Sequence, residues 1–252
     1  MSSLALLALA AFFLVAPRFF LTRQPRSEIH GLLVPLACIN KLYCLFWHRL
    51  EAEHAPLPEA GPVILIANHT CAIDHFLLQA TSNRLLSFMV AKEFYDHKIF
   101  GLGCRLIQCI PVKRDGHDLG ATRDALRALN AGRVVPIFPE GHITPESGRV
   151  IKAGKAGVGF IALKAKVPVI PAFLYGTPRQ SWFWRCMATP SHARILYGPP
   201  VDLADLVDHD KGRADIEAAL ARIMDALDQL QAEAKRRDPM WWNAEPRPHT
   251  SP

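Results

Sequence analysis

The sequence lacks several features that would assign it to a class at once. Its six cysteines form no C-x-x-C pair, so no zinc-finger or disulfide framework is indicated, and reduced, buried thiols in a cytosolic compartment are expected instead. No unbroken apolar run reaches the roughly 20 residues of a typical membrane-spanning helix. No G-x-S-x-G sequence is present, which argues against a serine hydrolase. No internal repeat is present either.

An excess of acidic residues is also missing, because 29 basic residues face 23 acidic ones and the net charge is +6. This balance suits an anionic partner, either a membrane surface or a phosphorylated substrate. Nucleic acid is the competing partner, but no basic stripe interleaved with aromatics and no KH-type spacing is present. We therefore expect a membrane lipid surface as a partner and no nucleic acid. The length of 252 residues fits one sizeable α/β domain with appendages.

The N-terminal part, residues 1–52, carries two apolar stretches. Leu4–Ala16 is thirteen residues long, which as a helix spans about 20 Å, less than the roughly 30 Å hydrocarbon core. No Lys or Arg precedes it, so a signal peptide fits poorly. Leu32–Trp47 is the second stretch, and arginines lie between the two. We expect apolar helices that associate with the cytoplasmic face of a bacterial inner membrane or its equivalent. A true span of Leu4–Ala16 and ordinary packing of Leu32–Trp47 on the domain both stay open.

Residues 53–240 read as an α/β domain, with 241–252 as a C-terminal tail that looks disordered, although its two tryptophans suit a membrane interface. Short apolar runs alternate with helical patterns, which predicts a mixed, mostly parallel sheet flanked by helices. A long amphipathic helix follows, with Ile216, Leu220, Ile223, Leu227 and Leu230 on one face, and it ends in Lys235-Arg236-Arg237. Prolines at 168 and 171 suggest an edge strand or a bulge. The expected strands are 63–67, 86–90, 108–113, 134–138, 169–174 and 193–196, and the expected helices lie near 73–80, 119–129 and 157–166.

The stretch Asn68–Phe76, "NHTCAIDHF", follows the first buried strand. A spacing of five does not bring two side chains together on one regular helix or on one strand. His69 and Asp74 therefore meet only if His69 lies on the turn that leaves the strand and Asp74 in the first turn of the next helix.

Polar residues follow other strands as well. Lys113 and Arg114 follow "IPV", and Glu140 and Gly141 follow the strand that begins at Val134. Sites in open α/β sheets collect outside the carboxyl ends of the strands. These ends are therefore expected to form one pocket with His69 and Asp74.

These segments together resemble the glycerolipid acyltransferases, the lysophosphatidic acid acyltransferase family. His69 to Asp74 matches the H-x-x-x-x-D motif, Phe138 to Gly141 matches F-P-E-G, Ile110 to Arg114 matches the block that ends in a basic residue, and Val167 to Pro171 matches V-P-V-I-P. The similarity covers roughly residues 62–198, and the four blocks have the order and spacing of the family.

The resemblance implies an O-acyltransferase of phospholipid biosynthesis. His69 would be the general base and Asp74 would orient it. Substrate binding falls to Lys113, Arg114, Glu140, Gly141 and Thr144, and the Gly141 peptide N–H could approach a substrate oxygen because no side chain is in the way. No cofactor or metal is implied.

The implied reaction moves a fatty acyl group from acyl-CoA or acyl carrier protein to a lysophospholipid, with 1-acyl-glycerol-3-phosphate as the leading acceptor. The chain departs from the family at Ile143, where an arginine is usual, which admits a lyso-ornithine lipid or another lysophospholipid as acceptor. Lys152 and Lys155 could restore the positive charge. Glycerol-3-phosphate is a close alternative acceptor.

Two other interpretations of the function stay open. The first is a metal site, since His69, Cys71, Asp74 and His75 are all ligand types, although their spacing matches no common zinc pattern. The second is a non-catalytic membrane-binding protein with an acyltransferase-like fold. Metal analysis and an acyl-transfer assay separate these readings from the enzyme.

Overall fold

A computed structural model describes residues 29, 31, 33–98, 100–113, 118–144, 146–179, 182–207 and 212–244. The apolar run at 4–16, Arg114 and residues 245–252 lie outside the described residues. The expectations that fall on them, the first membrane helix and one substrate-binding arginine, are therefore not tested by the fold.

The main sheet has the strand order β1-β7-β6-β2-β5. Its strands are β1 (Glu51–Ala52), β2 (Val63–Ala67), β5 (Val134–Ile137), β6 (Val169–Tyr175) and β7 (Arg194–Tyr197). β2 pairs in parallel with β5 and β6, β7 pairs in parallel with β1, and only β6 and β7 are antiparallel. A second, parallel pair is formed by β3 (Met89–Ala91) and β4 (Ile110–Val112). The expected mixed, mostly parallel sheet is confirmed.

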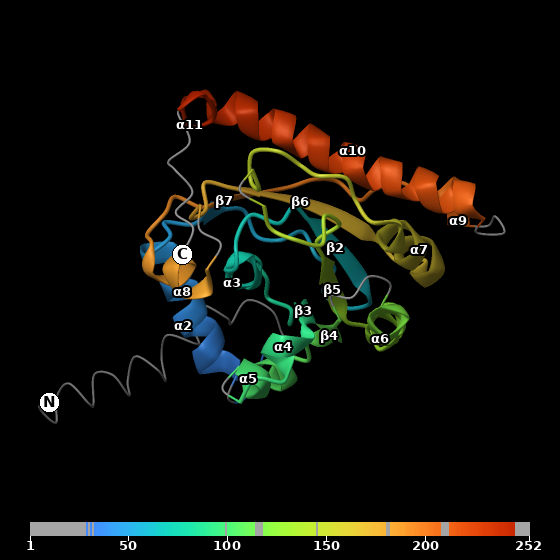
Figure 1. Ribbon diagram of the computed structural model, residues 1–252, viewed down its shortest axis with the longest axis horizontal. Coiled ribbons are helices and arrows are strands. Elements are labelled where there is room, and N and C mark those ends of the chain that lie inside the picture. The colour runs from blue at the N-terminus through green and yellow to red at the C-terminus, as the bar shows by residue number, and fades with distance from the viewer. Residues whose placement is uncertain are drawn as a thin grey trace, which may run out of the picture.

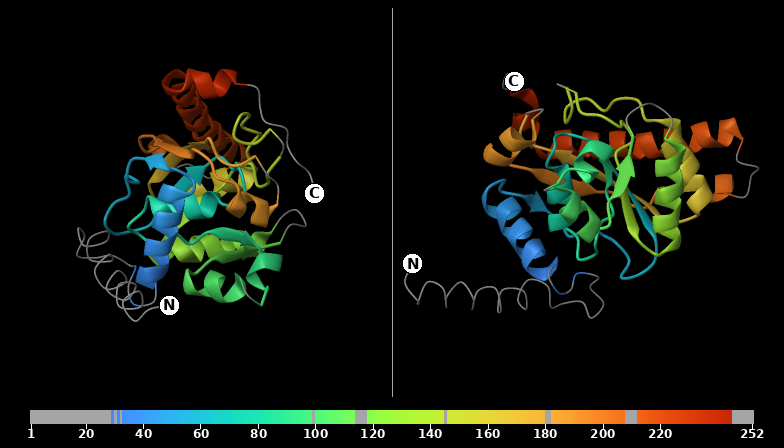
Figure 2. Two further views of the ribbon diagram at one scale, coloured as in Figure 1. Left: turned by 90° about the vertical axis from the view of Figure 1, so that its left-hand side faces the viewer. Right: turned by 60° about the horizontal axis from the view of Figure 1, so that its bottom comes forward.

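The central strand β2 is buried over its whole length, because helices cover both faces of the sheet. Alternate residues point to opposite faces of a strand. Val63 and Leu65 accordingly belong to one apolar core, while Ile64 and Ile66 belong to another. Figures 1 and 2 show the long helix α10 (Arg213–Arg237) along one face and α2 (Leu33–Phe46) and α3 (Asp74–Ala80) on the opposite side. This explains why β2 is a continuous apolar run without alternation.

The helices on the two faces follow from the pattern of their apolar residues. α10 packs against α7 and β6, and its buried residues are Ala219, Ile223, Leu227, Leu230 and Ala234, which repeat every three or four positions. The helices are α2 (Leu33–Phe46), α3 (Asp74–Ala80), α4 (Lys92–Tyr95), α5 (Phe100–Leu106), α6 (Leu119–Asn130), α7 (Ala156–Ala165), α8 (Phe183–Ala188), α9 (Ala204–Val207), α10 and α11 (Pro239–Asn243).

The expectation that Pro168 and Pro171 mark an edge strand is wrong. β6 lies between β7 and β2. Pro171 is tolerated there because the antiparallel ladder with β7 begins only at Ala172 opposite Tyr197. The carbonyl of Pro171 accepts the N–H of Gly198, just beyond the end of β7. The missing proline N–H therefore falls where that ladder has ended.

The two ends of the described chain are more closely tied to the domain than expected. β1 pairs with β7 in the main sheet, although it lies within the segment expected to be separate. Trp241 and Trp242, expected in a disordered tail or at a membrane interface, lie in α11 and contact the ring of Tyr175 at 5.5 and 6.2 Å between centroids. None of the described helices is long and apolar enough to cross a bilayer.

The close packing of α7 on α10 gives a test of the fold. A Cβ added at Gly159 would lie 2.3 Å from the backbone oxygen of Ile216, whereas one added at Gly157 would meet nothing within 4 Å. Gly159→Ala should therefore lower the free energy of unfolding by about 1–3 kcal/mol, because the helices must separate. Gly157→Ala, on the same helix, should change it by less than about 1 kcal/mol or raise it. Urea unfolding measures both, and equal effects would contradict the packing.

Candidate active site

The site begins where β2 ends. Asn68 is buried and follows β2 directly. Its side chain takes the place of a backbone hydrogen-bonding partner of β6. The amide nitrogen donates to the carbonyl of Leu174 at 2.9 Å, and the amide oxygen accepts the Leu174 N–H at 2.7 Å. Both backbone groups of Leu174 are thereby satisfied. Asn68 fixes the point at which the chain leaves β2, and so the position of His69.

His69 lies on the turn after β2, and Asp74 opens α3. The His69 Nδ1 atom is 2.8 Å from Asp74 Oδ2, which agrees with the arrangement expected from the sequence. A carboxylate only accepts hydrogen bonds, so Nδ1 carries the proton and Nε2 of the neutral ring is left as a base. The Asp74 side chain is fully buried, while 14% of the His69 side chain is exposed.

The Asp74 carboxylate is held by several donors besides His69. Thr70 donates its backbone N–H to Oδ2 and its hydroxyl to Oδ1, and the Cys71 N–H donates to Oδ2 at 3.1 Å. Burial on its own would raise the pKa of Asp74, but the hydrogen bonds and charge of His69 and the hydrogen bonds of Thr70 outweigh it and hold the pKa below the usual value. Thr177, beyond β6, donates to the Thr70 hydroxyl at 2.8 Å. The buried carboxylate therefore stays ionised at neutral pH.

Aromatic rings fix the plane of the imidazole. The His69 ring stacks on Phe138 with centroids 4.2 Å apart and an interplanar angle of 13°. His75 contacts both rings edge-on, at 5.9 Å from His69 and 5.4 Å from Phe138. Burial lowers the pKa of His75 to about 4, so this second histidine is neutral at pH 7. Phe138 follows β5, so the neighbouring strands β2 and β5 bring these rings together.

Glu140 joins the turn after β2 to the segment that precedes α7. One carboxylate oxygen accepts the backbone N–H of His69 at 2.9 Å, and the other accepts the backbone N–H of Lys152 at 3.1 Å. Burial raises the pKa of Glu140, although these two bonds oppose the shift. The structure thus gives Glu140 a contact with the backbone of His69 that the sequence did not reveal.

Two residues expected to bind substrate are engaged within their own turn. The Gly141 N–H donates to the carbonyl of Phe138, so the expectation that this N–H faces a substrate is wrong. Gly141 has φ 71°, a conformation that favours glycine. The Thr144 carbonyl accepts the Ser147 N–H, and the Thr144 N–H donates to the Ser147 hydroxyl oxygen. Thr144 therefore shapes the loop after Gly141.

The basic residues near the motifs differ in their surroundings. Lys113 is exposed at the end of β4, where its backbone N–H donates to Asp118. Lys152 forms an ion pair with the exposed Glu146 at 3.3 Å. Lys155 lies against Gly141, the turn that follows Phe138. Among the described residues, no hydrogen bond or ion pair joins Lys113 to His69 or Asp74.

The alternative of a metal site has no cluster behind it in the part of the chain that the structure describes. There, no three His, Cys, Asp or Glu side chains converge as metal ligands. Cys71 is buried, and burial raises the pKa of its thiol well above the ordinary value. The thiol form is therefore favoured, which does not suit a nucleophile or ligand. All six cysteines are free, and five of them are buried, as expected for reduced thiols.

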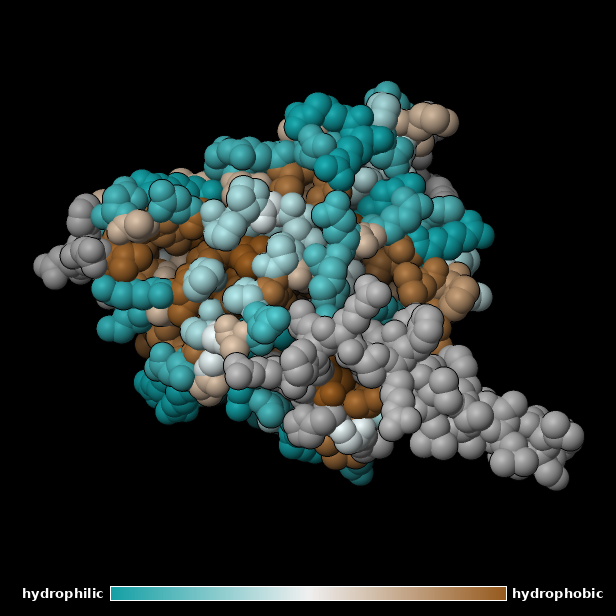
Figure 3. Space-filling model, turned by 180° about the vertical axis from the view of Figure 1, so that it is seen from behind, coloured by the Kyte–Doolittle hydropathy of each residue, from teal (hydrophilic) through white to brown (hydrophobic). Residues whose placement is uncertain are grey.

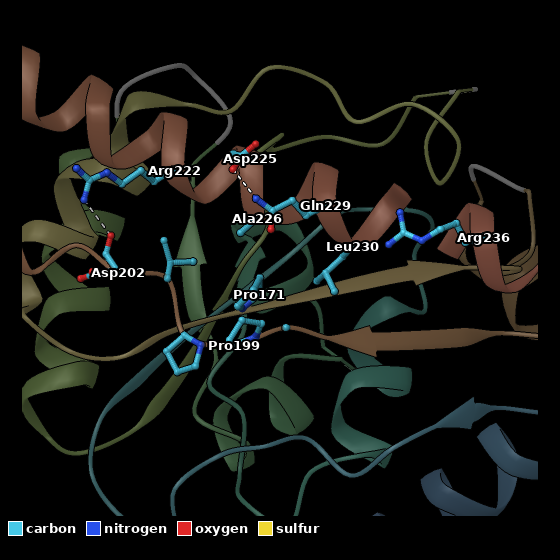
Figure 4. Close-up of a pocket in the computed structure, with 12 residues that line it drawn as sticks. Pro171, Pro199, Asp202, Arg222, Asp225, Ala226, Gln229, Leu230 and Arg236 are labelled. Atoms are coloured by element: carbon cyan, nitrogen blue, oxygen red, sulfur yellow. Dashed lines mark hydrogen bonds between the residues drawn. The ribbon is translucent and has the colours of Figure 1, made fainter. Parts of the chain in front are cut away.

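A groove elsewhere on the domain does not include His69 or Asp74. It lies between α10 and the turn after β7, as Figure 4 shows. Its charged residues already have partners: Arg222 binds Asp205 and the carbonyl of Asp202, and Arg236 binds Glu233. The groove is therefore not part of this site.

An α/β sheet with a buried His–Asp pair at the carboxyl ends of its strands is the arrangement of an enzyme that uses a histidine base. A family model described as "Acyltransferase" matches residues 49–175, about half of the chain. The chain belongs to this acyltransferase family, which confirms the family expected from the motifs.

The individual relatives share only about a quarter of the matched residues with this chain. An uncharacterized protein of Mycobacterium tuberculosis is 26% identical over 145 residues, which are 52% of this chain and 38% of the relative. The chain thus spans well under half the length of the mycobacterial relatives that it matches. A 1-acyl-sn-glycerol-3-phosphate acyltransferase of Bacillus subtilis is 27% identical over 151 residues, 58% of this chain and 72% of that protein.

The fold has a counterpart among solved structures. The crystal structure of a 1-acyl-sn-glycerophosphate acyltransferase from Thermotoga maritima superposes with a TM-score of 0.58 at 18% sequence identity. The match covers 90% of this chain and 91% of that chain. At this identity the likeness supports the fold.

The contacts of Glu140 can be tested by substitution. A glutamine offers one acceptor oxygen, so Glu140→Gln can hold either the His69 N–H or the Lys152 N–H, but not both. Since a small displacement of a reacting group is costly, kcat for acyl transfer should fall about 10–100-fold. The control is Glu146→Gln, an exposed residue of the same loop, which should stay within about twofold because exposed ion pairs contribute little. A normal kcat in folded Glu140→Gln would contradict this role.

Proposed function

We propose that this chain transfers a fatty acyl group from an acyl thioester to the free hydroxyl of a lysophospholipid. We take 1-acyl-glycerol-3-phosphate as the acceptor and phosphatidic acid as the product. The observation that carries the proposal is the 2.8 Å contact between His69 Nδ1 and the buried Asp74 carboxylate, which leaves Nε2 as a base on a partly exposed ring. The name of the Bacillus subtilis relative supports the same acceptor.

The residues account for each proton in the reaction. Nε2 of His69 takes the proton of the acceptor hydroxyl while the oxygen attacks the thioester carbonyl. The imidazolium that forms is stabilised by the ionised Asp74. The C–S bond then breaks, an ester C–O bond has formed, and the imidazolium returns its proton to the leaving thiolate. No enzyme nucleophile is required, because the acceptor supplies the attacking oxygen.

The donor is acyl-CoA or acyl carrier protein, and no cofactor takes part in the proposed reaction. A second group of acceptors is favoured by one observation, the apolar Ile143 just after Gly141. An uncharged side chain there admits a lyso-ornithine lipid or a lysophospholipid with a larger head group. Glycerol-3-phosphate is a further alternative acceptor that does not rest on Ile143. We propose that Arg114, with Lys113, binds the anionic group of the acceptor. A panel of acceptors with both donors distinguishes these possibilities, and the absence of any transfer would favour a non-catalytic membrane-binding protein.

We also propose that the enzyme works on a lipid surface at the cytoplasmic face of the membrane. Support comes from large exposed apolar side chains on α2, α5 and α8 and the residues beside them. These three helices lie toward the lower left of Figure 1. We call this set the apolar end: Leu36, Ile39, Phe46, Phe94, Leu102, Trp182 and Trp184. In Figure 3, where this end is at the right, hydrophobic surface reaches the solvent.

The apolar end is continuous with the site and carries basic residues. Phe100 of α5 contacts Phe183 of α8 at 5.4 Å, and Phe183 contacts Phe76 of α3, two residues after Asp74. Lys98, Arg105 and Arg185 are exposed among these helices. Aromatic rings beside basic residues suit the interface of an anionic bilayer.

The base is tested by His69→Ala. Loss of a general base should lower kcat about 10²–10⁴-fold while the fold and vesicle binding persist. Asp74→Asn should lower kcat by a similar or smaller factor, because the amide disturbs the tautomer and removes the charge. His54→Ala, an exposed histidine before β2, is the matched control and should keep its activity. Near-normal turnover in folded His69→Ala would rule out the mechanism.

Membrane association is tested by sedimentation with vesicles that contain anionic lipid. Trp182→Ser with Trp184→Ser should weaken binding by about tenfold or more, since two large interfacial side chains are lost. Deletion of residues 1–22 should also weaken it and leave the domain folded. The control is Leu119→Ser, an exposed apolar residue on α6, which should bind like the wild type. If the tryptophan variant binds vesicles as fully as this control, the apolar end is not a membrane surface.

A further inference from the structure

The Lys155 side chain lies directly over the Cα of Gly141. A Cβ at Gly141 would be 2.6 Å from both Cε and Nζ of Lys155, closer than atoms can approach. Any other residue at position 141 would therefore displace the ammonium. The Lys155 ammonium thus occupies the space that a side chain at position 141 would take.

Hydrogen bonds hold Lys155 close to the base. The Lys155 N–H donates to the carbonyl of Pro139 at 2.9 Å, and the Lys152 N–H donates to Glu140. The same Glu140 accepts the backbone N–H of His69. The segment before α7 is thus joined to the turn 139–141 on one side, and that turn is joined to His69 on the other. The backbone of Lys155 is therefore held by the same turn that holds the backbone of His69.

The charge of Lys155 is not used by a carboxylate. Glu140 is buried and accepts two backbone N–H groups. Glu146 pairs with Lys152. Among the described residues, no carboxylate forms an ion pair with Lys155, whose side chain is exposed. Ile143, two residues after Gly141, contributes no charge of its own.

We propose that Lys155 Nζ, seated over Gly141, binds a phosphate ester oxygen of a substrate whose reacting group lies at His69. This inference rests on the proposed acyl transfer. The phosphate has two sources, the head group of the acceptor or the phosphates of the thioester donor. In either case the ammonium orients the substrate, and Lys155 is a positioning residue that takes no part in proton transfer.

The test compares Lys155→Met with Lys164→Met in the purified full chain. Methionine keeps an unbranched apolar stem and removes the charge, and Lys164 is an exposed lysine on α7, the helix that follows Lys155. Loss of a charge-assisted hydrogen bond should raise the KM of the phosphate-bearing substrate about 10–100-fold, with kcat changed less than about threefold. A raised KM for 1-acyl-glycerol-3-phosphate identifies the acceptor as the source of the phosphate, and a raised KM for acyl-CoA identifies the donor.

Direct binding makes this inference separable from the proposed reaction. Calorimetry with glycerol 3-phosphate and with coenzyme A should show one of them weakened about tenfold or more by Lys155→Met, and neither by Lys164→Met. If the wild type transfers no acyl group, the proposed reaction fails, and this binding difference still supports the phosphate site. Lys155→Met that matches Lys164→Met in both KM values and in both binding experiments overturns the inference.

Discussion

A fully buried carboxylate must be matched by donors, and Asp74 shows how much structure that demands. Its two oxygens take hydrogen bonds from the Thr70 backbone and hydroxyl, the Cys71 N–H and the His69 ring. Removing such an ion from water costs several kcal/mol unless these bonds are in place. The turn between β2 and α3 is therefore determined by its aspartate, and the orientation of the imidazole follows from the same set of bonds.

The position of the turn between β2 and α3 depends on the sheet. β2 has parallel neighbours on both sides, so its carboxyl end lies beside the ends of β5 and β6. Phe138 and Glu140 follow β5. Phe138 stacks on the imidazole of His69, and Glu140 accepts the backbone N–H of His69. β6 delivers Leu174 and Thr177, which pair with Asn68 and Thr70. The two apolar cores hold β2 in place. The positions of the strands therefore determine where the side chains of the site lie.

The sequence predicted most strands, the helices α3, α6, α7 and α10, and the central pair, but not β1, α4, α5, α8, α9 or α11. β2 and the segment 119–129 were recognisable because their apolar pattern is unambiguous, and His69 and Asp74 were recognisable because only one local geometry brings them together. What the sequence did not show depends on partners far along the chain. Glu140 contacts His69 across 71 positions, and Thr177 contacts Thr70 across 107. Pro171 was misread because its tolerance depends on where the neighbouring strand β7 ends, which no local pattern encodes.

In the neutral His69 ring, Nδ1 carries the proton because Asp74 accepts it, which leaves Nε2 free to accept another proton. The ¹⁵N chemical shifts of the His69 ring report the tautomer directly. We expect a protonated Nδ1 and an unprotonated Nε2 in the neutral ring of the wild type. In Asp74→Asn the preference for this tautomer should be lost. A neutral ring whose proton lies on Nε2 in the wild type would contradict this expectation.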